Sequence, residues 1–135
     1  MCIFCQLANN DSKKIYADKD IYAIFDKSQS YFGHILVIPK KHYENILEIP
    51  KKIHNKLTNM AILIGKIEKN IFNANGIKIL INTGKEADQT IMHCHIHVIP
   101  YNLVKKENYS NNKNLKRKII ANITNKINQF IKKIN

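Results

Sequence analysis

Residues 92–99 alternate histidine with apolar or small side chains, and this alternation constrains the fold more than any other feature of the chain. Successive side chains of a β-strand point to opposite faces, so His93, His95 and His97 are predicted to share one face. The residues between them, Cys94 among them, are then expected to face a core. Histidine fills cores poorly and titrates near neutrality, so three imidazoles on one face suit metal ligation, proton transfer or nucleophilic attack.

The hydrophobic pattern elsewhere predicts an α+β fold with an antiparallel sheet of about five strands. Helical periodicity favours one long helix at 51–72, a short N-terminal helix at 3–9 and an amphipathic C-terminal helix at 115–134. Strands joined by short turns, with one long helix between them, indicate an antiparallel sheet with helices to one side. Strands are expected at residues 15–17, 20–26, 33–40, 77–82 and 92–99, with Pro100 stopping the last one.

The chain of 135 residues carries a formal net charge of +12, which is unevenly distributed along the sequence. We expect a body at 1–104 and a basic helical extension at 105–135, where nine Lys and Arg face the single acid Glu107. A solvated helix face explains this tail, and so does a phosphate-rich partner, either nucleic acid or an acidic membrane surface. The heavy use of Lys, Asn and Ile is also typical of an AT-rich genome, which would raise the lysine count without a functional cause.

The three cysteines, at positions 2, 5 and 94, argue against a secreted disulfide framework because their number is odd and two of them come so early. No apolar run approaches membrane-spanning length, and the first residues lack a signal-peptide pattern. We therefore expect a soluble, cytoplasmic protein without a membrane partner.

Spacing limits what the three histidines can do together. At a rise of about 3.3 Å per residue, His93 and His97 lie about 13 Å apart on a strand, too far to share one ion at about 2 Å from each nitrogen. Cys2 and Cys5 form a C-x-x-C pair, which is a standard zinc half-site that two further ligands would complete.

The loop before the histidines is rich in small and amide-bearing residues. Asn82, Gly84, Gln89 and Thr90 lead directly into the row of imidazoles. Amides, hydroxyls and backbone N–H groups beside imidazoles suit an oxyanion such as phosphate. The residues themselves thus suggest a phosphate held by loop donors and attacked by a histidine.

Two long segments resemble the marked motifs of the histidine triad (HIT) family of nucleotide hydrolases and transferases. The first is N-T-G-K-E-A-D-Q-T-I-M-H-C-H-I-H-V-I-P, and the second, upstream, is F-D-K-S-Q-S-Y-F-G-H-I-L-V-I-P-K-K-H-Y. The N-terminal C-I-F-C is similar to the start of many bacterial members. The resemblance covers about three quarters of the chain and implies the antiparallel HIT-like fold.

The resemblance also implies a role for each matching residue. His95 matches the nucleophile, which attacks the α-phosphate and forms a nucleotidyl-histidine that water resolves. Phosphate or leaving-group contacts fall on His34, Asn82, Gln89, Thr90 and His97. Nucleoside contacts fall on Asp26, which would receive the ribose hydroxyls, and on the apolar walls Phe4, Leu7 and Ile24.

By the same resemblance, His42 and His93 complete a zinc site with Cys2 and Cys5. Four protein ligands leave no open position, so such a zinc is structural rather than catalytic. The alternative is an ordinary pair of thiols that bind no metal.

The implied activity is hydrolysis of purine nucleoside 5′-phosphoramidates by a homodimer. Hydrolysis of dinucleoside polyphosphates is a second enzyme interpretation, and a nucleotide- or RNA-binding module without turnover is a third. The last is favoured by the basic tail and by Asp88, which stands where the family usually has glycine. A carboxylate pointing inward there would repel a phosphate, although Asp tolerates the left-handed backbone and can turn outward.

Overall fold

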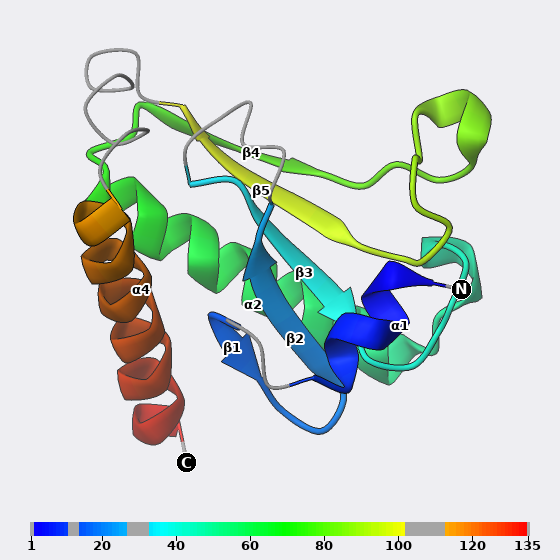
Figure 1. Cartoon of the computed structure of the whole chain (residues 1–135), viewed down its shortest axis with the longest axis horizontal. Helices are drawn as coiled ribbons and strands as arrows, with labels where there is room; N and C mark the ends of the chain where they lie inside the picture. Colours follow the sequence, from blue (N-terminus) through cyan, green and yellow to red (C-terminus); the bar gives the residue numbers. More distant parts are fainter. Residues whose placement is uncertain (1, 11–13, 27–32, 102–112, 135) are drawn as a thin grey trace.

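The computed structural model describes residues 2–10, 14–26, 33–101 and 113–134 (Figure 1). Its strands form one antiparallel sheet in the order β1-β2-β3-β5-β4, which confirms the predicted fold class. The strands are β1 (Tyr16–Ala17), β2 (Ile21–Phe25), β3 (Ile35–Pro39), β4 (Gly76–Leu80) and β5 (Ile96–Tyr101). The helices are α1 (Ile3–Ala8), α2 (Lys51–Ile71) and α4 (Lys113–Ile134), with 3-10 turns η1 (Ile46–Glu48) and η2 (Lys85–Ala87) that the sequence did not predict.

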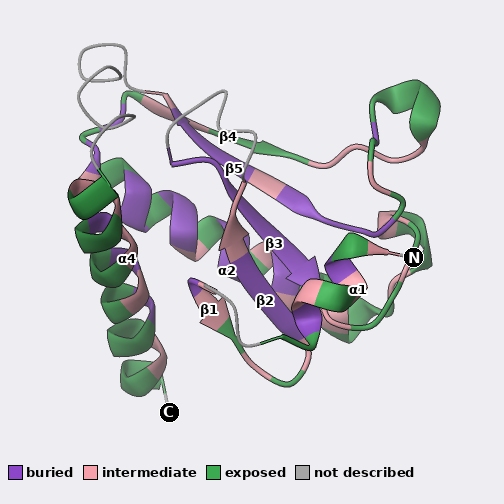
Figure 2. Cartoon of the chain, viewed as in Figure 1, coloured by how far each residue is buried: buried purple, intermediate pink, exposed green. Residues whose placement is uncertain are grey.

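The two faces of the sheet are buried by different elements (Figures 1 and 2). Alternate residues of the central strands pack beneath α2, among them Ile35, Val37 and Ile96. The opposite face carries Tyr22 and Leu36, which pack against α1 in a smaller cluster. Because His97 lies opposite Leu36 in the β3–β5 register, its ring belongs to the α1 face.

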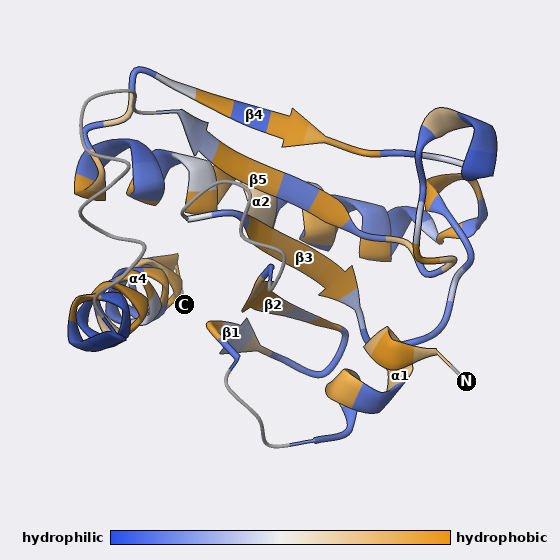
Figure 3. Ribbon diagram, turned by 45° about the horizontal axis from the view of Figure 1, so that its top comes forward, coloured by the Kyte–Doolittle hydropathy of each residue, from blue (hydrophilic) through white to orange (hydrophobic). Residues whose placement is uncertain are grey.

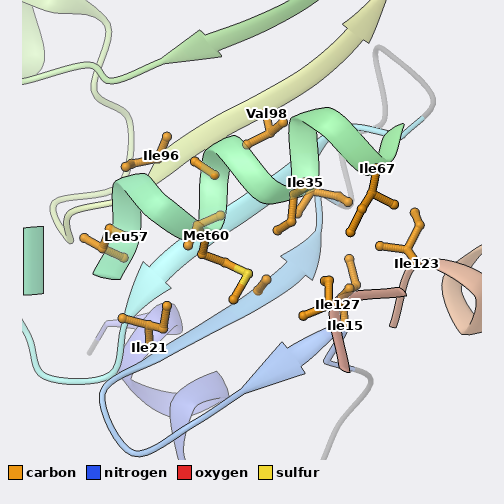
Figure 4. Packing of buried hydrophobic residues seen from close by; sticks show 14 of the residues in the cluster. Ile15, Ile21, Ile35, Leu57, Met60, Ile67, Ile96, Val98, Ile123 and Ile127 are labelled. Atoms are coloured by element: carbon orange, nitrogen blue, oxygen red, sulfur yellow. The ribbon is translucent and has the colours of Figure 1, made fainter. Parts of the chain in front are cut away.

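The C-terminal helix α4 is part of the main core. Its buried stripe, Ile119, Ile123 and Ile127, packs into the cluster beneath α2 (Figure 4), and its apolar side is turned toward the rest of the chain (Figure 3). The Thr124 hydroxyl donates to the Ile15 carbonyl at 2.9 Å. The predicted boundary between 104 and 105 lies outside the described residues. Among the residues that are described, no helix is long and apolar enough to cross a membrane.

The histidine segment departs from the predicted strand at both ends. Strand β5 begins at Ile96 rather than at residue 92, because the Cys94 N–H bonds the Tyr43 carbonyl at 2.7 Å instead of joining a ladder. The prediction that Pro100 stops the strand is wrong, since Pro100 pairs with Ile77. Pairing of β5 with β3 ends at Val98, so beyond that residue β5 tolerates a proline that lacks an N–H.

A tight corner precedes His34. Gly33 has φ 84°, and a Cβ there would lie 2.8 Å from Glu68 Oε2, 2.8 Å from Pro100 and 2.9 Å from Phe72. Glu68 is fully buried, and neither of its carboxyl oxygens has a hydrogen-bond partner in the described part of the chain. Burial raises the pKa of Glu68 well above its ordinary value.

Candidate active site and metal cluster

The three histidine rings lie in one row although only His97 is in a strand. The Phe4 ring contacts both His93 and His95, with centroids 5.7 and 5.2 Å away, and the His95 and His97 centroids are 4.8 Å apart. Cys94 points the other way into the main core and is 1% exposed. The predicted separation into a histidine face and a core face is therefore confirmed, while the predicted cause, a continuous strand, holds only from residue 96 onward.

His95 is positioned as a nitrogen nucleophile. Its Nδ1 lies 2.7 Å from the His93 carbonyl oxygen, which can only accept a hydrogen bond, so Nδ1 carries the proton and Nε2 carries the lone pair. His95 is 6% exposed, and burial lowers the pKa of its imidazole although the bond to His93 and the charge of Asp26 oppose that shift. A neutral ring with a fixed tautomer is the form that attacks phosphorus.

His97, His34 and Asp26 form a chain beside the nucleophile. His34 Nε2 lies 2.8 Å from His97 Nδ1, and His34 Nδ1 lies 3.2 Å from Asp26 Oδ2. Burial is the largest cause that lowers the pKa of both imidazoles, that of His97 to about 4. Both rings are consequently neutral near pH 7, with the Asp26 carboxylate at the end of the chain.

Cys2, Cys5, His42 and His93 converge in a second cluster. Each offers one ligand atom, and these atoms lie within 4.8 Å of one another. The His93 Nδ1 is 3.3 Å from Cys2 Sγ, 3.5 Å from Cys5 Sγ and 3.1 Å from His42 Nδ1. Tetrahedral zinc with bonds of about 2.05 Å to nitrogen and 2.3 Å to sulfur separates its ligands by about 3.3–3.7 Å, so this donor set fits zinc.

The second nitrogen of His93 fixes its tautomer. His93 Nε2 lies 2.8 Å from the Pro39 carbonyl, so Nε2 carries the proton and the Nδ1 lone pair faces the two sulfurs. Such an outer hydrogen bond is typical of metal-binding histidines. As spacing predicted, His93 and His97 fall in different clusters of ligand atoms.

The loop before the histidines is held by Gln89. The buried Gln89 amide donates to the Glu44 carbonyl at 2.6 Å and to the Ile91 carbonyl at 3.0 Å, while its oxygen accepts from the Gly84 N–H at 2.8 Å. These hydrogen bonds tie the Gln89 side-chain amide to backbone groups of the loop. The predicted contact of Gln89 with phosphate stays a prediction. Its sequence position alone did not reveal this structural role.

The other loop residues predicted to contact phosphate are accessible. Asn82 Nδ2 donates to the Asp88 carbonyl at 3.2 Å, and Thr90 is exposed. Asp88 adopts the left-handed conformation, with φ 68° and ψ 20°, and is exposed. An aspartate thus keeps the loop in a backbone conformation that glycine adopts most readily.

The α1 face gathers the residues predicted to contact the nucleoside. Phe4 is buried, and Leu7 and Ile24 are half-buried against the same cluster. The buried Tyr22 hydroxyl donates to the Phe4 carbonyl at 2.6 Å and so ties α1 to the sheet. Sequence reasoning did not assign Tyr22 a role, although its position in a strand, two residues before Ile24, places both on one face.

Comparison with known proteins places the chain in a family. The HIT domain model matches residues 8–104, which is most of the chain, so the chain belongs to the HIT family. It is 33% identical over 101 residues to adenylylsulfatase HINT3 of Arabidopsis thaliana, covering 73% of this chain and 51% of that protein.

Solved structures agree with this placement. A hypothetical histidine triad nucleotide-binding protein from Sulfolobus tokodaii has a TM-score of 0.82 and 30% identity, covering 95% of this chain and 93% of that one. A zinc-bound histidine triad family protein from Mycobacterium smegmatis has a TM-score of 0.77 and 28% identity, covering 92% of this chain and 94% of that one. The fold of the described residues is therefore the fold of HIT proteins.

Proposed function

We propose that this protein is a nucleotide hydrolase or transferase that acts through a nucleotidyl intermediate on His95. The observation that carries the proposal is the 2.7 Å contact between His95 Nδ1 and the His93 carbonyl, which directs the Nε2 lone pair to the substrate. In the first step a bond forms between Nε2 and the α-phosphorus, and the bond to the leaving group breaks. The leaving group departs with a proton from solvent. Water then attacks the phosphorus, the bond between phosphorus and Nε2 breaks, Nε2 regains its lone pair, and the proton of the water returns to solvent.

The surrounding residues suit a nucleoside phosphate. His34, His97, Asn82, Thr90 and the Gln89 loop are proposed to surround the phosphate. Phe4, Leu7 and Ile24 are proposed to contact the base, and Asp26 the ribose hydroxyls. The Arabidopsis relative is named an adenylylsulfatase, which supports a nucleotide substrate, and the Sulfolobus structure is named a hypothetical nucleotide-binding protein.

Purine nucleoside 5′-phosphoramidates are the proposed substrates, and dinucleoside polyphosphates are the alternative. Both substrates would pass through the same nucleotidyl-histidine, so the turnover rates measured with each distinguish them. We expect faster release of amine from a phosphoramidate than of nucleotide from a dinucleoside polyphosphate.

Intermediate trapping tests the proposed chemistry. Rapid acid quench of the protein with a labelled nucleoside phosphoramidate should give a nucleotidyl adduct by mass spectrometry, and His95→Ala should abolish it. His54→Ala is a matched control, because His54 is exposed on α2 and lies on the opposite side of the sheet. A wild-type protein that gives neither adduct nor turnover would overturn the proposal.

A structural zinc held by Cys2, Cys5, His42 and His93 is part of the proposal. The fit of the ligand atoms and the zinc-bound relative from Mycobacterium smegmatis support it. The zinc would tie the N-terminal end of α1 to the segment before β5, beside the nucleophile. Because thiolate ligands require reduced cysteines, we also propose a cytoplasmic location.

A homodimer is proposed through the edge strand β4. Among the described strands β4 pairs only with β5, and its Ile79 and Leu80 are 46% and 38% exposed. An exposed apolar edge strand is a surface that pairs readily with a second copy. Sedimentation analysis of wild type and Ile79→Lys checks this, with a monomeric variant expected.

Binding of nucleic acid without turnover is the second candidate function, and the positive charge of helices α2 and α4 favours it. Helices α2 and α4 together carry twelve Lys and Arg residues and a single acid, Glu68, which is buried. Association with RNA that weakens steeply as salt is added would support this candidate. Absence of binding at low salt would reject it.

A further inference from the structure

We propose that Asp26 is a positioning residue: acting through His34, it keeps the proton of the neutral His97 ring on Nδ1 and leaves on Nε2 a lone pair that takes the proton of the attacking water. The water in question hydrolyses the nucleotidyl intermediate on His95, so this step rests on the proposed function. The tautomer of His97, by contrast, follows from contacts between described residues alone.

The sheet brings the three residues together at one end of three neighbouring strands. The Asp26 N–H donates to the His34 carbonyl at 2.9 Å, which continues the β2–β3 ladder by one pair. His97 of β5 lies opposite Leu36, two residues after His34, so the two imidazoles are diagonal neighbours on one face, with ring centroids 5.1 Å apart. His34 consequently lies between a carboxylate and a second imidazole.

The carboxylate decides which imidazole donates to the other. His34 Nε2 and His97 Nδ1 are 2.8 Å apart, so one of these nitrogens donates and the other accepts. If His34 were the donor, the lone pair on its Nδ1 would face Asp26 Oδ2 at 3.2 Å. If His97 is the donor, the His34 Nδ1–H faces that oxygen instead. The second arrangement is favoured by about tenfold, the usual strength of a contact between an N–H and a charged group.

The poor alignment of the contact with Asp26 does not change this choice. His34 Nδ1 is buried and makes no well-aligned hydrogen bond with any described residue. A negative charge 3.2 Å away still attracts an N–H dipole and repels a lone pair, because the interaction is electrostatic. Bulk water does not reach this nitrogen, so solvent screens the interaction little.

An acceptor on His97 suits the second step of the proposed reaction. The rings of His95 and His97 are neighbours, with centroids 4.8 Å apart. The oxygen of water forms a bond to phosphorus, while the bond from phosphorus to His95 Nε2 breaks and its electron pair returns to that nitrogen. The proton of the water passes to His97 Nε2 and from there to solvent. While it is positive, the His97 ring still donates through Nδ1 to His34, and the charge of Asp26 stabilises it.

The surrounding charges agree with this role for His97. Burial, followed by the neighbouring His95 and His34, lowers the pKa of His97 to about 4, although Asp26 opposes the shift. Near neutral pH, Nε2 therefore carries no proton and can accept one. The negative charge of a phosphate beside the ring would raise this pKa, which makes the ring a stronger base toward a bound intermediate.

Nuclear magnetic resonance tests the tautomer without any turnover. Long-range proton–nitrogen correlation spectra of the isotope-labelled full-length protein show which ring nitrogen of each histidine carries the proton. Near neutral pH, His97 should be protonated on Nδ1, Asp26→Asn should reduce this preference by about tenfold, and Asp26→Glu, which keeps the charge, should retain most of it. Glu44→Gln removes a charge at an exposed position and is the matched control that should change nothing. A wild-type His97 protonated on Nε2 overturns the proposal.

Single-turnover kinetics with a labelled nucleoside phosphoramidate test the proton transfer. Asp26→Asn should slow hydrolysis of the nucleotidyl adduct by about tenfold, so that the adduct accumulates. Loss of a ribose contact alone would instead weaken substrate binding and leave hydrolysis of the adduct unchanged.

The outcomes separate this proposal from the proposed hydrolase. A His97 tautomer that Asp26→Asn leaves unchanged overturns the positioning role. An altered tautomer with unchanged hydrolysis of the adduct overturns the role of His97 as the base. If the tautomers behave as expected but the wild type forms no adduct, the positioning of His97 stands and the hydrolase proposal fails.

Discussion

Replacing Gly33 with alanine tests whether the corner before His34 is as crowded as the structure shows. The added methyl group meets two separate obstacles. Gly33 has φ 84°, a region that residues with a Cβ rarely adopt, and the Cβ position lies within 3 Å of atoms of Glu68, Phe72 and Pro100. A proline ring and a phenylalanine ring cannot move aside as the tip of an exposed side chain can.

The expected cost is the sum of these two effects. The left-handed backbone costs a residue with a Cβ about 1–2 kcal/mol, and overpacking a close-packed core costs about 1–3 kcal/mol. Relative to a Gly→Ala change at an unstrained, uncrowded glycine, Gly33→Ala should therefore lower the free energy of unfolding by about 2–5 kcal/mol. The gain from restricting the unfolded chain, about 0.4–1 kcal/mol, is shared by every Gly→Ala change and cancels in comparisons.

Two other glycines separate the effects. Gly84 has φ 89° but nothing within 4 Å of its Cβ position, and Gly76 has neither a positive φ nor a close neighbour. In urea unfolding, Gly84→Ala should lose about 1–2 kcal/mol relative to Gly76→Ala. Gly33→Ala should lose about 1–3 kcal/mol more than Gly84→Ala, and a difference below about 0.5 kcal/mol would refute the steric argument.

Three further predictions concern buried groups and the metal. Burial raises the pKa of Glu68 well above its ordinary value of 4.5. Between pH 4.5 and the folded-state pKa, the folded protein therefore holds a proton that the unfolded chain releases. In that range the free energy of unfolding of the wild type falls as the pH rises, by up to about 1.4 kcal/mol per pH unit. Glu68→Gln should remove this fall, which is measured by urea unfolding of both proteins at about pH 5 and about pH 8. If the free energies of unfolding of wild type and variant change equally with pH, Glu68 does not have a raised pKa. Tyr22→Phe removes the hydroxyl that donates to the Phe4 carbonyl and should cost about 0.5–1.5 kcal/mol in the same assay, whereas a neutral effect would mean that α1 is anchored otherwise. Cys5→Ser should purify with much less zinc by elemental analysis than Cys94→Ser, and equal contents would argue against the proposed site.

The fold was predictable because its elements carry strong local patterns. The helix at 51–71 and the strand at 35–39 lie within one or two residues of their predicted bounds. The bounds of β5 were not predictable, because they depend on partners distant in sequence. Cys94 leaves the ladder to bond Tyr43, and Pro100 stays in the sheet because β3 has already ended.

The residue types of the site were predictable, and their partners were only partly so. Alternation predicted that the three rings face one way, and spacing predicted that His93 and His97 bind different partners. The fixed sequence distance from Asp26 to His34 linked the two residues, but it did not reveal the 3.2 Å contact of their side chains. Nor did the pattern reveal that, among the described residues, the Gln89 side chain bonds only backbone groups. Helical spacing places Glu68 on the apolar stripe of the helix, four residues after Ile64, but it does not reveal that the carboxyl group is fully buried without a hydrogen-bond partner among the described residues.

The departure of residues 93–95 from the strand links the metal cluster to the proposed chemistry. In a regular strand the carbonyl groups lie in the plane of the sheet, away from the side chains that stand on its faces. The His93 carbonyl reaches the His95 ring because this segment is irregular. The same His93 contacts Cys2 and Cys5 through Nδ1 and bonds Pro39 through Nε2. An ion held by these ligands would fix the carbonyl that sets the His95 tautomer, so the proposed structural zinc would act on the proposed nucleophile without touching substrate.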